Sequence, residues 1–201
     1  HNSSRSNLLR GLERSLQRLA VDSVDVWLVH VYDANTPLEE VASTLLHVLD
    51  QGNAQYVGVS NYSAWQMTRL HSLMDGRGLL GAHEFEYSLL QRGAEREVLP
   101  AAEALGVGSL AWSPLGRGVL TGKYRNSIPA DSRAASPHWG NFARALINDD
   151  SRAVVEAVNA AATGLGVSPL EVALSWVIGS GKIASAITGS RTAAQDRKST
   201  R

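Results

Sequence analysis

Apolar segments of strand length alternate with amphipathic segments of helix length along most of this chain. Residues 24–33 form a nearly continuous apolar run rich in valine, and further runs of strand length occupy 56–60, 82–90, 107–115 and 183–189. Runs that alternate with helices in this way are typical of parallel strands whose faces are covered by helices. We therefore expect an α/β fold with five parallel strands, and we expect the strand at 24–33 to be buried on both faces.

The predicted helices fill the intervals between the strands. Leucines at helical spacing predict a helix over 6–20. Pro37, followed by acidic Glu39, marks the start of the next one, because proline and negative charge both favour the first helical turn. Further helices are expected at 65–73, 95–106, 151–164 and 168–179. Gly, Pro, Ser and Asn scattered through 116–148 predict a long irregular segment.

Composition limits the classes of partner. Lys+Arg and Asp+Glu both number 19, so we expect no concentrated positive face for nucleic acid or a membrane surface. The absence of cysteine excludes disulfides and thiolate metal sites. No apolar run approaches the ~20 residues of a membrane-spanning helix, and the first residues lack the apolar core of a signal peptide. We expect a soluble, cytoplasmic protein.

Residues with useful chemistry lie at the C-terminal ends of the predicted strands, where parallel α/β folds bind their ligands. In chain order these positions are His30, Ser60 and Asn61, Glu84 to Tyr87, Trp112 to Leu115, and Gly189 to Arg191. They supply an imidazole, small hydrogen-bonding groups, an aromatic plane and an arginine beside a glycine. Such a set suits a flat heteroaromatic ring that carries an amide and phosphates.

Five sequence blocks, in order, resemble the aldo-keto reductases. They are SLQRLAVDSVDVWLVHVYD, YVGVSNYSAWQ, FEYSLLQR, AWSPLGRGVLTGKY and ITGSRTAAQ, and they cover most of residues 6–195. The resemblance implies a (β/α)₈ TIM barrel and hydride transfer between NADP(H) and a carbonyl or alcohol. Because five strands are too few for a barrel of ~250 residues, we expect an incomplete one. Residues 1–195 would hold about strands 4 to 8, without the first three βα units, and 196–201 would be a tail that departs from the family pattern.

The resemblance assigns the nicotinamide end of the site. His30 matches the active-site histidine that donates a hydrogen bond to the substrate oxygen, and Trp112 matches the aromatic residue that stacks on the nicotinamide ring. Ser60 and Asn61 match the pair that binds the carboxamide. Glu84 stands where the family usually has glutamine. An ionised carboxylate accepts hydrogen bonds but cannot donate them, so two interpretations of Glu84 stay open: binding the carboxamide differently, or facing solvent.

Two further segments match the phosphate end of the cofactor. The loop over the pyrophosphate corresponds to Ser113, Leu115, Gly116 and Arg117, where glycine permits close approach and arginine supplies positive charge. The contacts to the 2′-phosphate and adenine correspond to Ser190, Arg191 and Gln195, which favours NADP(H) over NAD(H). A P-loop is excluded, because Tyr124 stands where serine or threonine must bind magnesium.

Ordinary structural roles remain open for the same residues. His30 and Trp112 also suit packing in a buried strand, and Asn61 also suits the cap of a helix. Arg191 also suits a solvated turn. The other histidines are predicted to lie on the surface or in loops, without the spacing of a metal site: His1, His47, His71, His83 and His138.

The family's proton-donating tyrosine, and the lysine and aspartate that tune it, come from the first three βα units. None of the tyrosines in this chain lies in that motif. We therefore predict an NADP-dependent oxidoreductase for a small-molecule carbonyl or alcohol, of which this fragment is inactive alone. A non-catalytic, dinucleotide-binding regulatory barrel resembling a channel subunit stays open as the alternative. The sequence does not indicate the substrate, the physiological direction or the oligomeric state.

Overall fold

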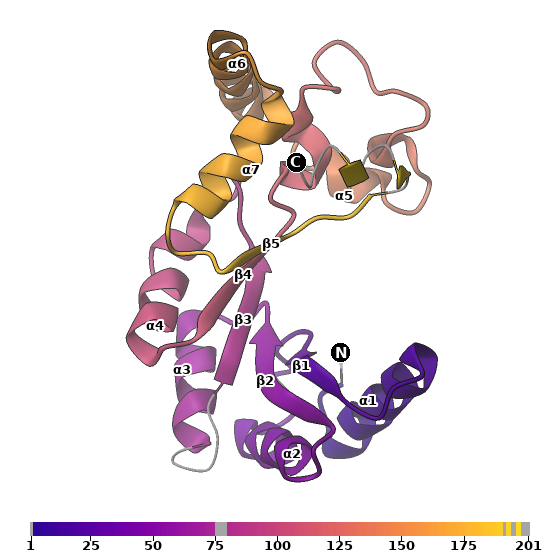
Figure 1. Cartoon of the computed structure of the whole chain (residues 1–201), viewed down its shortest axis with the longest axis vertical. Helices are drawn as coiled ribbons and strands as arrows, with labels where there is room; N and C mark the ends of the chain where they lie inside the picture. The colour runs from indigo at the N-terminus through magenta and orange to yellow at the C-terminus, as the bar shows by residue number, and fades with distance from the viewer. Residues whose placement is uncertain (1, 75–79, 191, 194–195, 198–201) are drawn as a thin grey trace. The chain divides into compact units, whose positions relative to one another are not determined.

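A computed structural model describes residues 2–74, 80–190, 192–193 and 196–197 (Figure 1). The strands are β1 (Val24–Val29), β2 (Ala54–Ser60), β3 (Leu80–Glu86), β4 (Gly108–Trp112) and β5 (Ser185–Ile187). The α-helices are α1 (Arg5–Leu19), α2 (Leu38–Asp50), α3 (Ala64–Leu73), α4 (Val98–Leu105), α5 (Gly140–Arg144), α6 (Asp149–Leu165) and α7 (Pro169–Gly179). The 3₁₀ helices are η1 (Gly93–Glu95), η2 (Gly116–Thr121) and η3 (Arg133–Ala135).

Each strand and helix predicted from the sequence is present, with shifted ends. The segment 116–148, predicted to be irregular, contains η2, η3 and α5. Pro100 lies in the first turn of α4, which begins at Val98. Proline is tolerated there because the first N–H groups of a helix have no partner within the helix.

The strands are hydrogen-bonded in the order β1-β2-β3-β4-β5. β1 is parallel to β2, and β2 is parallel to β3. The register between β2 and β3 shifts at Gly58, where a Cβ atom would lie 2.1 Å from the carbonyl oxygen of Ala82. Only glycine permits this close approach of the two backbones. A sheet ordered as the chain is ordered is what successive βα units produce.

The chain forms two compact units. The first contains residues 1–85 and 95–110, and the second contains residues 86–94 and 111–201. Strand β4 contributes to both units, because its last two residues, Ala111 and Trp112, belong to the second.

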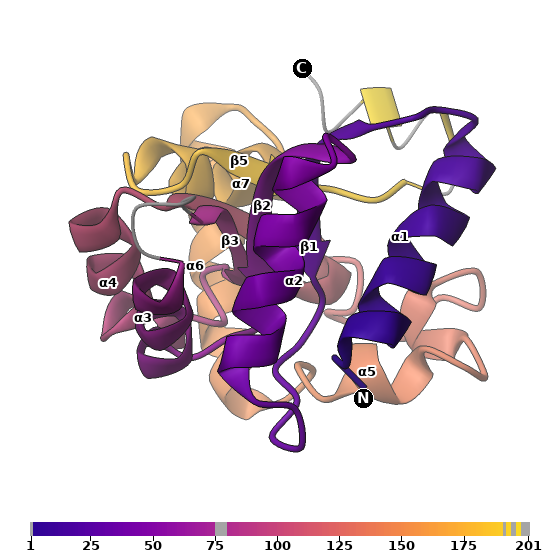
Figure 2. The same ribbon diagram turned by 90° about the horizontal axis from the view of Figure 1, so that it is seen from below.

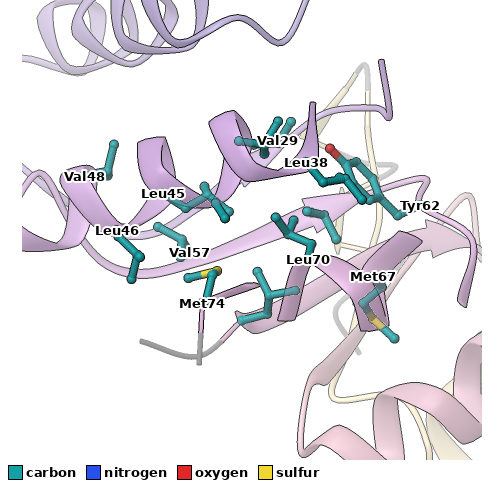
Figure 3. Close-up of a cluster of buried hydrophobic side chains, with 14 of the residues drawn as sticks. Val29, Leu38, Leu45, Leu46, Val48, Val57, Tyr62, Met67, Leu70 and Met74 are labelled. Atoms are coloured by element: carbon teal, nitrogen blue, oxygen red, sulfur yellow. The ribbon is translucent and has the colours of Figure 1, made fainter. Parts of the chain in front are cut away.

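The core of the first unit is built on α2, which lies between α1 and α3 and covers β2 (Figure 2). Apolar residues recur along α2 at helical spacing, so one face of the helix is buried. Leu45 of α2, Val57 of β2 and Leu70 of α3 are fully buried in this core (Figure 3). Burying a side chain of this size stabilises the fold by roughly 1.5–3 kcal/mol.

The prediction that the first strand is buried on both faces is wrong. Val29 of β1 is buried, but Asp25 is exposed and Val26 is 44% exposed. β1 stands at one end of the sheet order, where it pairs with β2 alone among the described strands. The strand also ends at Val29 instead of Asp33.

The second unit has its own core, formed by η2, α5, α6 and α7. Helix α6 begins at its N-cap, Asn148, whose side chain accepts a hydrogen bond from the Ser151 backbone N–H at 2.9 Å. Helix α7 begins with a capping box in which Ser168 and Glu171 bond each other's backbone N–H groups. These caps satisfy N–H groups that a helix leaves without partners at its start.

His83 is buried, which corrects the prediction of a surface or loop position. Its side chain on β3 is fully inaccessible, and its ring lies 5.2 Å from that of Phe85. Burial lowers the pKa of His83 to about 4. The histidine is therefore neutral at pH 7.

Among the helices that the structure describes, none is by itself long and apolar enough to cross a membrane. Only α6 and α7 taken together reach that length and composition, and the chain bends by 99° between them.

Candidate functional site

Asn61 joins the ends of three neighbouring strands in the first unit. Its side-chain Nδ2 donates to the His30 carbonyl oxygen at 3.1 Å and to Ser60 Oγ at 2.9 Å. Its backbone N–H donates to the Glu84 carbonyl oxygen at 2.8 Å. The φ angle of Asn61 is +59°, a left-handed conformation that asparagine adopts more readily than most residues. The structure thus brings together four residues predicted for the nicotinamide end of the site.

The accessibility of these four residues differs. His30 follows the end of β1 and is exposed, so it does not pack inside a strand. Glu84 is half-buried, and Ser60 is only 2% exposed. An exposed imidazole at a strand end can donate a hydrogen bond to a ligand oxygen.

The alternative interpretation of Asn61 as the cap of a helix is wrong, because its amide N–H groups bond the strand ends and another residue caps α3. The N-cap of α3 is Ser63, whose backbone N–H donates to Gln66 Oε1 at 2.8 Å. Asn61 therefore fixes the strand ends, while the helix cap lies two residues further on.

Aromatic residues next to this cluster were missed by the sequence analysis. The ring of Tyr32 meets those of Tyr62 and Trp65 edge to face, with centroids 5.6 and 5.8 Å apart. Trp65 is 60% exposed. The available signal was the position of Tyr32 near the end of the predicted strand 24–33, and of Tyr62 directly after Asn61.

The loop after β1 is held by the buried carboxylate of Asp33. It accepts hydrogen bonds from the Ser3 backbone N–H at 2.9 Å, the Thr36 hydroxyl at 2.7 Å and the Asn35 backbone N–H at 3.1 Å. These bonds lower the pKa of Asp33 to about 2, and the bond from Ser3 has the largest effect. Asp33 turns the chain away from the strand, which leaves His30 at the start of a fixed loop.

The second unit contains a cavity of about 500 Å³. Its walls include five predicted residues, which are Trp112, Ser113, Leu115, Arg117 and Ser190. Gly116, also predicted, is buried in the same turn of chain. Arg191 and Gln195 lie outside the described residues.

The cavity also has cationic walls that the sequence analysis missed. Lys123 and Arg133 line it, together with the hydroxyl-bearing Thr121. Lys123 and Arg133 are both exposed. The signal for Lys123 was its place at the end of the block AWSPLGRGVLTGKY, which resembles the family.

Left-handed backbone is concentrated at the predicted site. Among the residues described, four other than glycine have positive φ, and three of these are Asn61, Ser113 and Arg117. Each such residue costs roughly 1–3 kcal/mol and persists only where its surroundings fix it. Gly116 has φ +55°, and a Cβ there would lie 2.8 Å from a methyl carbon of Leu90. The chain thus turns sharply directly beneath the cavity wall.

Arg117 is paired inside the protein. Its Nε and Nη2 donate to the two carboxylate oxygens of Glu86 at 2.7 and 2.6 Å, and its Nη1 donates to the Phe142 carbonyl oxygen at 2.8 Å. The side chains of Arg117 and Glu86 are 13% and 16% exposed. The Arg117 charge is therefore balanced by a carboxylate, whereas Lys123 and Arg133 have no ion pair within the described part of the chain.

The sequence model of the aldo/keto reductase family matches residues 1–201 of this chain. A probable voltage-gated potassium channel subunit beta of Oryza sativa subsp. japonica is 40% identical over 92% of this chain and 58% of that protein. One of Arabidopsis thaliana is 38% identical over 96% of this chain and 60% of that protein. The L-glyceraldehyde 3-phosphate reductase of Escherichia coli (strain K12) is 36% identical over 96% of this chain and 57% of that protein. The chain thus spans less than two thirds of the length of these relatives.

Proposed function

The chain belongs to the aldo/keto reductase family, and on that premise we propose that it carries the NADP(H)-binding residues of a cytoplasmic oxidoreductase for small carbonyl or alcohol substrates. The family implies an α/β barrel, and the five-stranded order is consistent with part of one. The observation that carries the proposal is the left-handed backbone at Asn61, Ser113 and Arg117. Strain of this kind is retained where it serves a site, and all three residues are among those that the family resemblance assigns to the cofactor.

The cavity of the second unit fits the phosphates and the ring of a dinucleotide. Its volume of about 500 Å³ is typical of ligand pockets. We assign stacking on the nicotinamide ring to Trp112, and phosphate binding to Lys123, Arg133 and Ser190. Cations and hydroxyls are the side chains that bind phosphate oxygens, and the indole face attracts a partly cationic ring. NADP(H), when bound, supplies or accepts the hydride.

Discrimination in favour of NADP(H) over NAD(H) is assigned to Arg191, and adenine binding to Gln195, by family resemblance. A guanidinium can form two parallel hydrogen bonds with a phosphate group. The 2′-phosphate is the group that separates the two cofactors, so an arginine at this position favours NADP(H).

The residues at the strand ends of the first unit are assigned to the carboxamide and the substrate. We assign the carboxamide to Ser60, Asn61 and Glu84, which are already joined by the hydrogen bonds of Asn61. The exposed imidazole of His30 is assigned to the substrate oxygen. When a carbonyl is reduced its oxygen gains negative charge, and a hydrogen bond from His30 stabilises that charge.

Turnover also requires a proton donor within ~2.6–3.2 Å of the substrate oxygen. The family's tyrosine, lysine and aspartate are not found in the blocks that this chain matches. We therefore propose that the 201-residue chain binds the cofactor without measurable carbonyl reduction. Loss of general acid catalysis alone lowers a rate by ~10²–10⁴.

A second candidate function is a regulatory barrel that binds the dinucleotide without turnover. It is favoured by the relatives from rice and Arabidopsis, which are named as probable channel subunits and are 40% and 38% identical to this chain. The reductase of E. coli is 36% identical, so identity alone does not separate the candidates.

Binding of NADP⁺ to the 201-residue chain, measured by isothermal titration calorimetry, tests the cofactor proposal. We expect binding that weakens in Lys123→Ala and Arg133→Ala and is retained in Arg125→Ala, because the guanidinium of Arg125 bonds Glu156 instead of lining the cavity. Absence of binding by the unmodified chain would refute the proposal. Reduction of an aromatic aldehyde with NADPH by the full-length protein, lost in His30→Ala, would then separate the enzyme from the regulatory candidate.

A further inference from the structure

We propose that Arg117 and Glu86 are positioning residues, which act through Phe142 to hold the ring of Trp112 in the cavity wall. This inference rests on the proposed function, since it concerns the same cofactor site. It departs from the sequence-based expectation that Arg117 supplies charge directly to the pyrophosphate.

The ion pair joins two segments of the second unit. Glu86 is the last residue of β3, and Arg117 lies in the turn after β4. Two parallel hydrogen bonds, of 2.7 and 2.6 Å, fix the plane of the guanidinium against the carboxylate. With side chains only 13% and 16% exposed, the pair is shielded from water and from salt. It therefore holds Arg117 in place despite its φ of +58°.

Phe142 connects this pair to Trp112. The Arg117 guanidinium carbon lies 3.7 Å from the centroid of the Phe142 ring, and Arg117 Nη1 donates to the Phe142 carbonyl oxygen at 2.8 Å. The rings of Phe142 and Trp112 are stacked, with centroids 6.3 Å apart and planes at 23°. Arg117 thus contacts both the backbone and the ring of Phe142, which lies in helix α5. A fixed Phe142 leaves the Trp112 indole fewer orientations.

The same contacts make Arg117 a poor phosphate ligand. Three of its N–H groups already donate within the protein, one face of the guanidinium is covered by Phe142, and its charge is balanced by Glu86. Lys123 and Arg133 line the same cavity and are exposed. Phosphate binding therefore belongs to these two cations, while Arg117 determines where the aromatic plane lies.

Indole N–H resonances of the ligand-free 201-residue chain test the positioning directly. In Glu86→Gln and in Arg117→Lys we expect the Trp112 resonance, assigned with Trp112→Phe, to shift or broaden, while those of Trp27 and Trp65 stay in place. Glu156→Gln is the matched control. Within the described part of the second unit, Glu156 accepts two hydrogen bonds from Arg125, as Glu86 does from Arg117. An unchanged Trp112 resonance in both variants, with Phe142→Leu also without effect, would overturn the inference.

Ligand binding by the same variants separates positioning from direct contact. Positioning predicts that Glu86→Gln and Arg117→Lys each weaken NADP⁺ about tenfold and leave adenosine 2′,5′-bisphosphate, which lacks the nicotinamide, within twofold. The double variant should be no weaker than either single one. Weakening of both ligands by Arg117→Lys, with tighter binding in Glu86→Gln, would show that Arg117 contacts phosphate. If the unmodified chain bound neither ligand, the proposed function would fail, and the indole resonances would still decide the positioning.

Discussion

Acidification should destabilise this protein in a pH range set by His83. The imidazole is fully buried on β3, and burial lowers its pKa to about 4 from an ordinary 6.5. In the unfolded chain the histidine takes up a proton as the pH falls through 6.5, whereas in the folded chain it stays neutral until about pH 4. Between these values the unfolded state binds more protons, so the free energy of unfolding falls with falling pH.

The size of the effect follows from the shift. One pKa unit corresponds to about 1.4 kcal/mol, so the full difference between folded and unfolded states amounts to about 3 kcal/mol. The contribution is fully retained above pH 6.5 and is lost progressively down to about pH 4. A loss of this size is a large part of the 5–15 kcal/mol by which domains are typically stable.

Urea unfolding followed by far-UV circular dichroism at several pH values between 4.5 and 7.5 measures this dependence. We expect the slope to become smaller in His83→Gln, whatever that substitution does to stability at pH 7.5, and to persist in His138→Gln, which alters an exposed histidine. Surface carboxylates with a lowered pKa, such as Glu171, still contribute near pH 4.5 in every variant. Asp33, whose pKa is lowered to about 2, contributes in the same direction only at lower pH, so this window separates the two. An equal slope in His83→Gln and the unmodified chain would refute the assignment.

Three further predictions concern close packing, cofactor choice and turnover. Gly58→Ala should destabilise the first unit by about 1–3 kcal/mol, because the new Cβ would meet the Ala82 carbonyl oxygen at 2.1 Å. Gly11→Ala, where nothing lies within 4 Å, should instead stabilise α1 by about 0.5–1 kcal/mol in the same denaturation assay. In the full-length protein, Arg191→Ala should weaken NADP(H) by about 1.5–3 kcal/mol and NAD(H) far less, whereas equal losses by calorimetry would show that it does not bind the 2′-phosphate. The 201-residue chain should not oxidise NADPH with an aromatic aldehyde, and turnover abolished by His30→Ala would contradict this.

The order of strands and helices could be predicted because it depends on local pattern. Leucines at helical spacing predicted α1, and Ser168-Pro169 predicted the start of α7. The end of β1 could not be read in the same way. Residues up to Asp33 continue the apolar run, but the carboxylate of Asp33 bonds Ser3, 30 residues earlier, and turns the chain. A partner so distant leaves no mark on the local sequence.

Local pattern could also have indicated the burial of His83, but it could not have indicated the ion pair beside the cavity. His83 shares a two-residue period with Phe85 of β3 and with Tyr87, which directly follows that strand. All three are buried, so the burial of His83 could have been inferred from alternation. The pairing of Arg117 with Glu86, 31 residues away, could not have been inferred, because either side chain alone is compatible with solvent.

One strand end in each unit has the same feature, a residue in the left-handed conformation directly after the strand. Asn61 follows β2 with φ +59°, and Ser113 follows β4 with φ +52°. Glycine would adopt either conformation at lower cost, so the retention of side chains at both positions indicates that the side chains are needed there. At Asn61 the structure supplies a reason in the bonds to His30 and Ser60. At Ser113 the backbone carbonyl accepts from Gly116 at 2.9 Å and closes the turn, while the residue itself lines the cavity. The backbone sets the path of the chain at these strand ends, and the side chains it carries there set the chemistry.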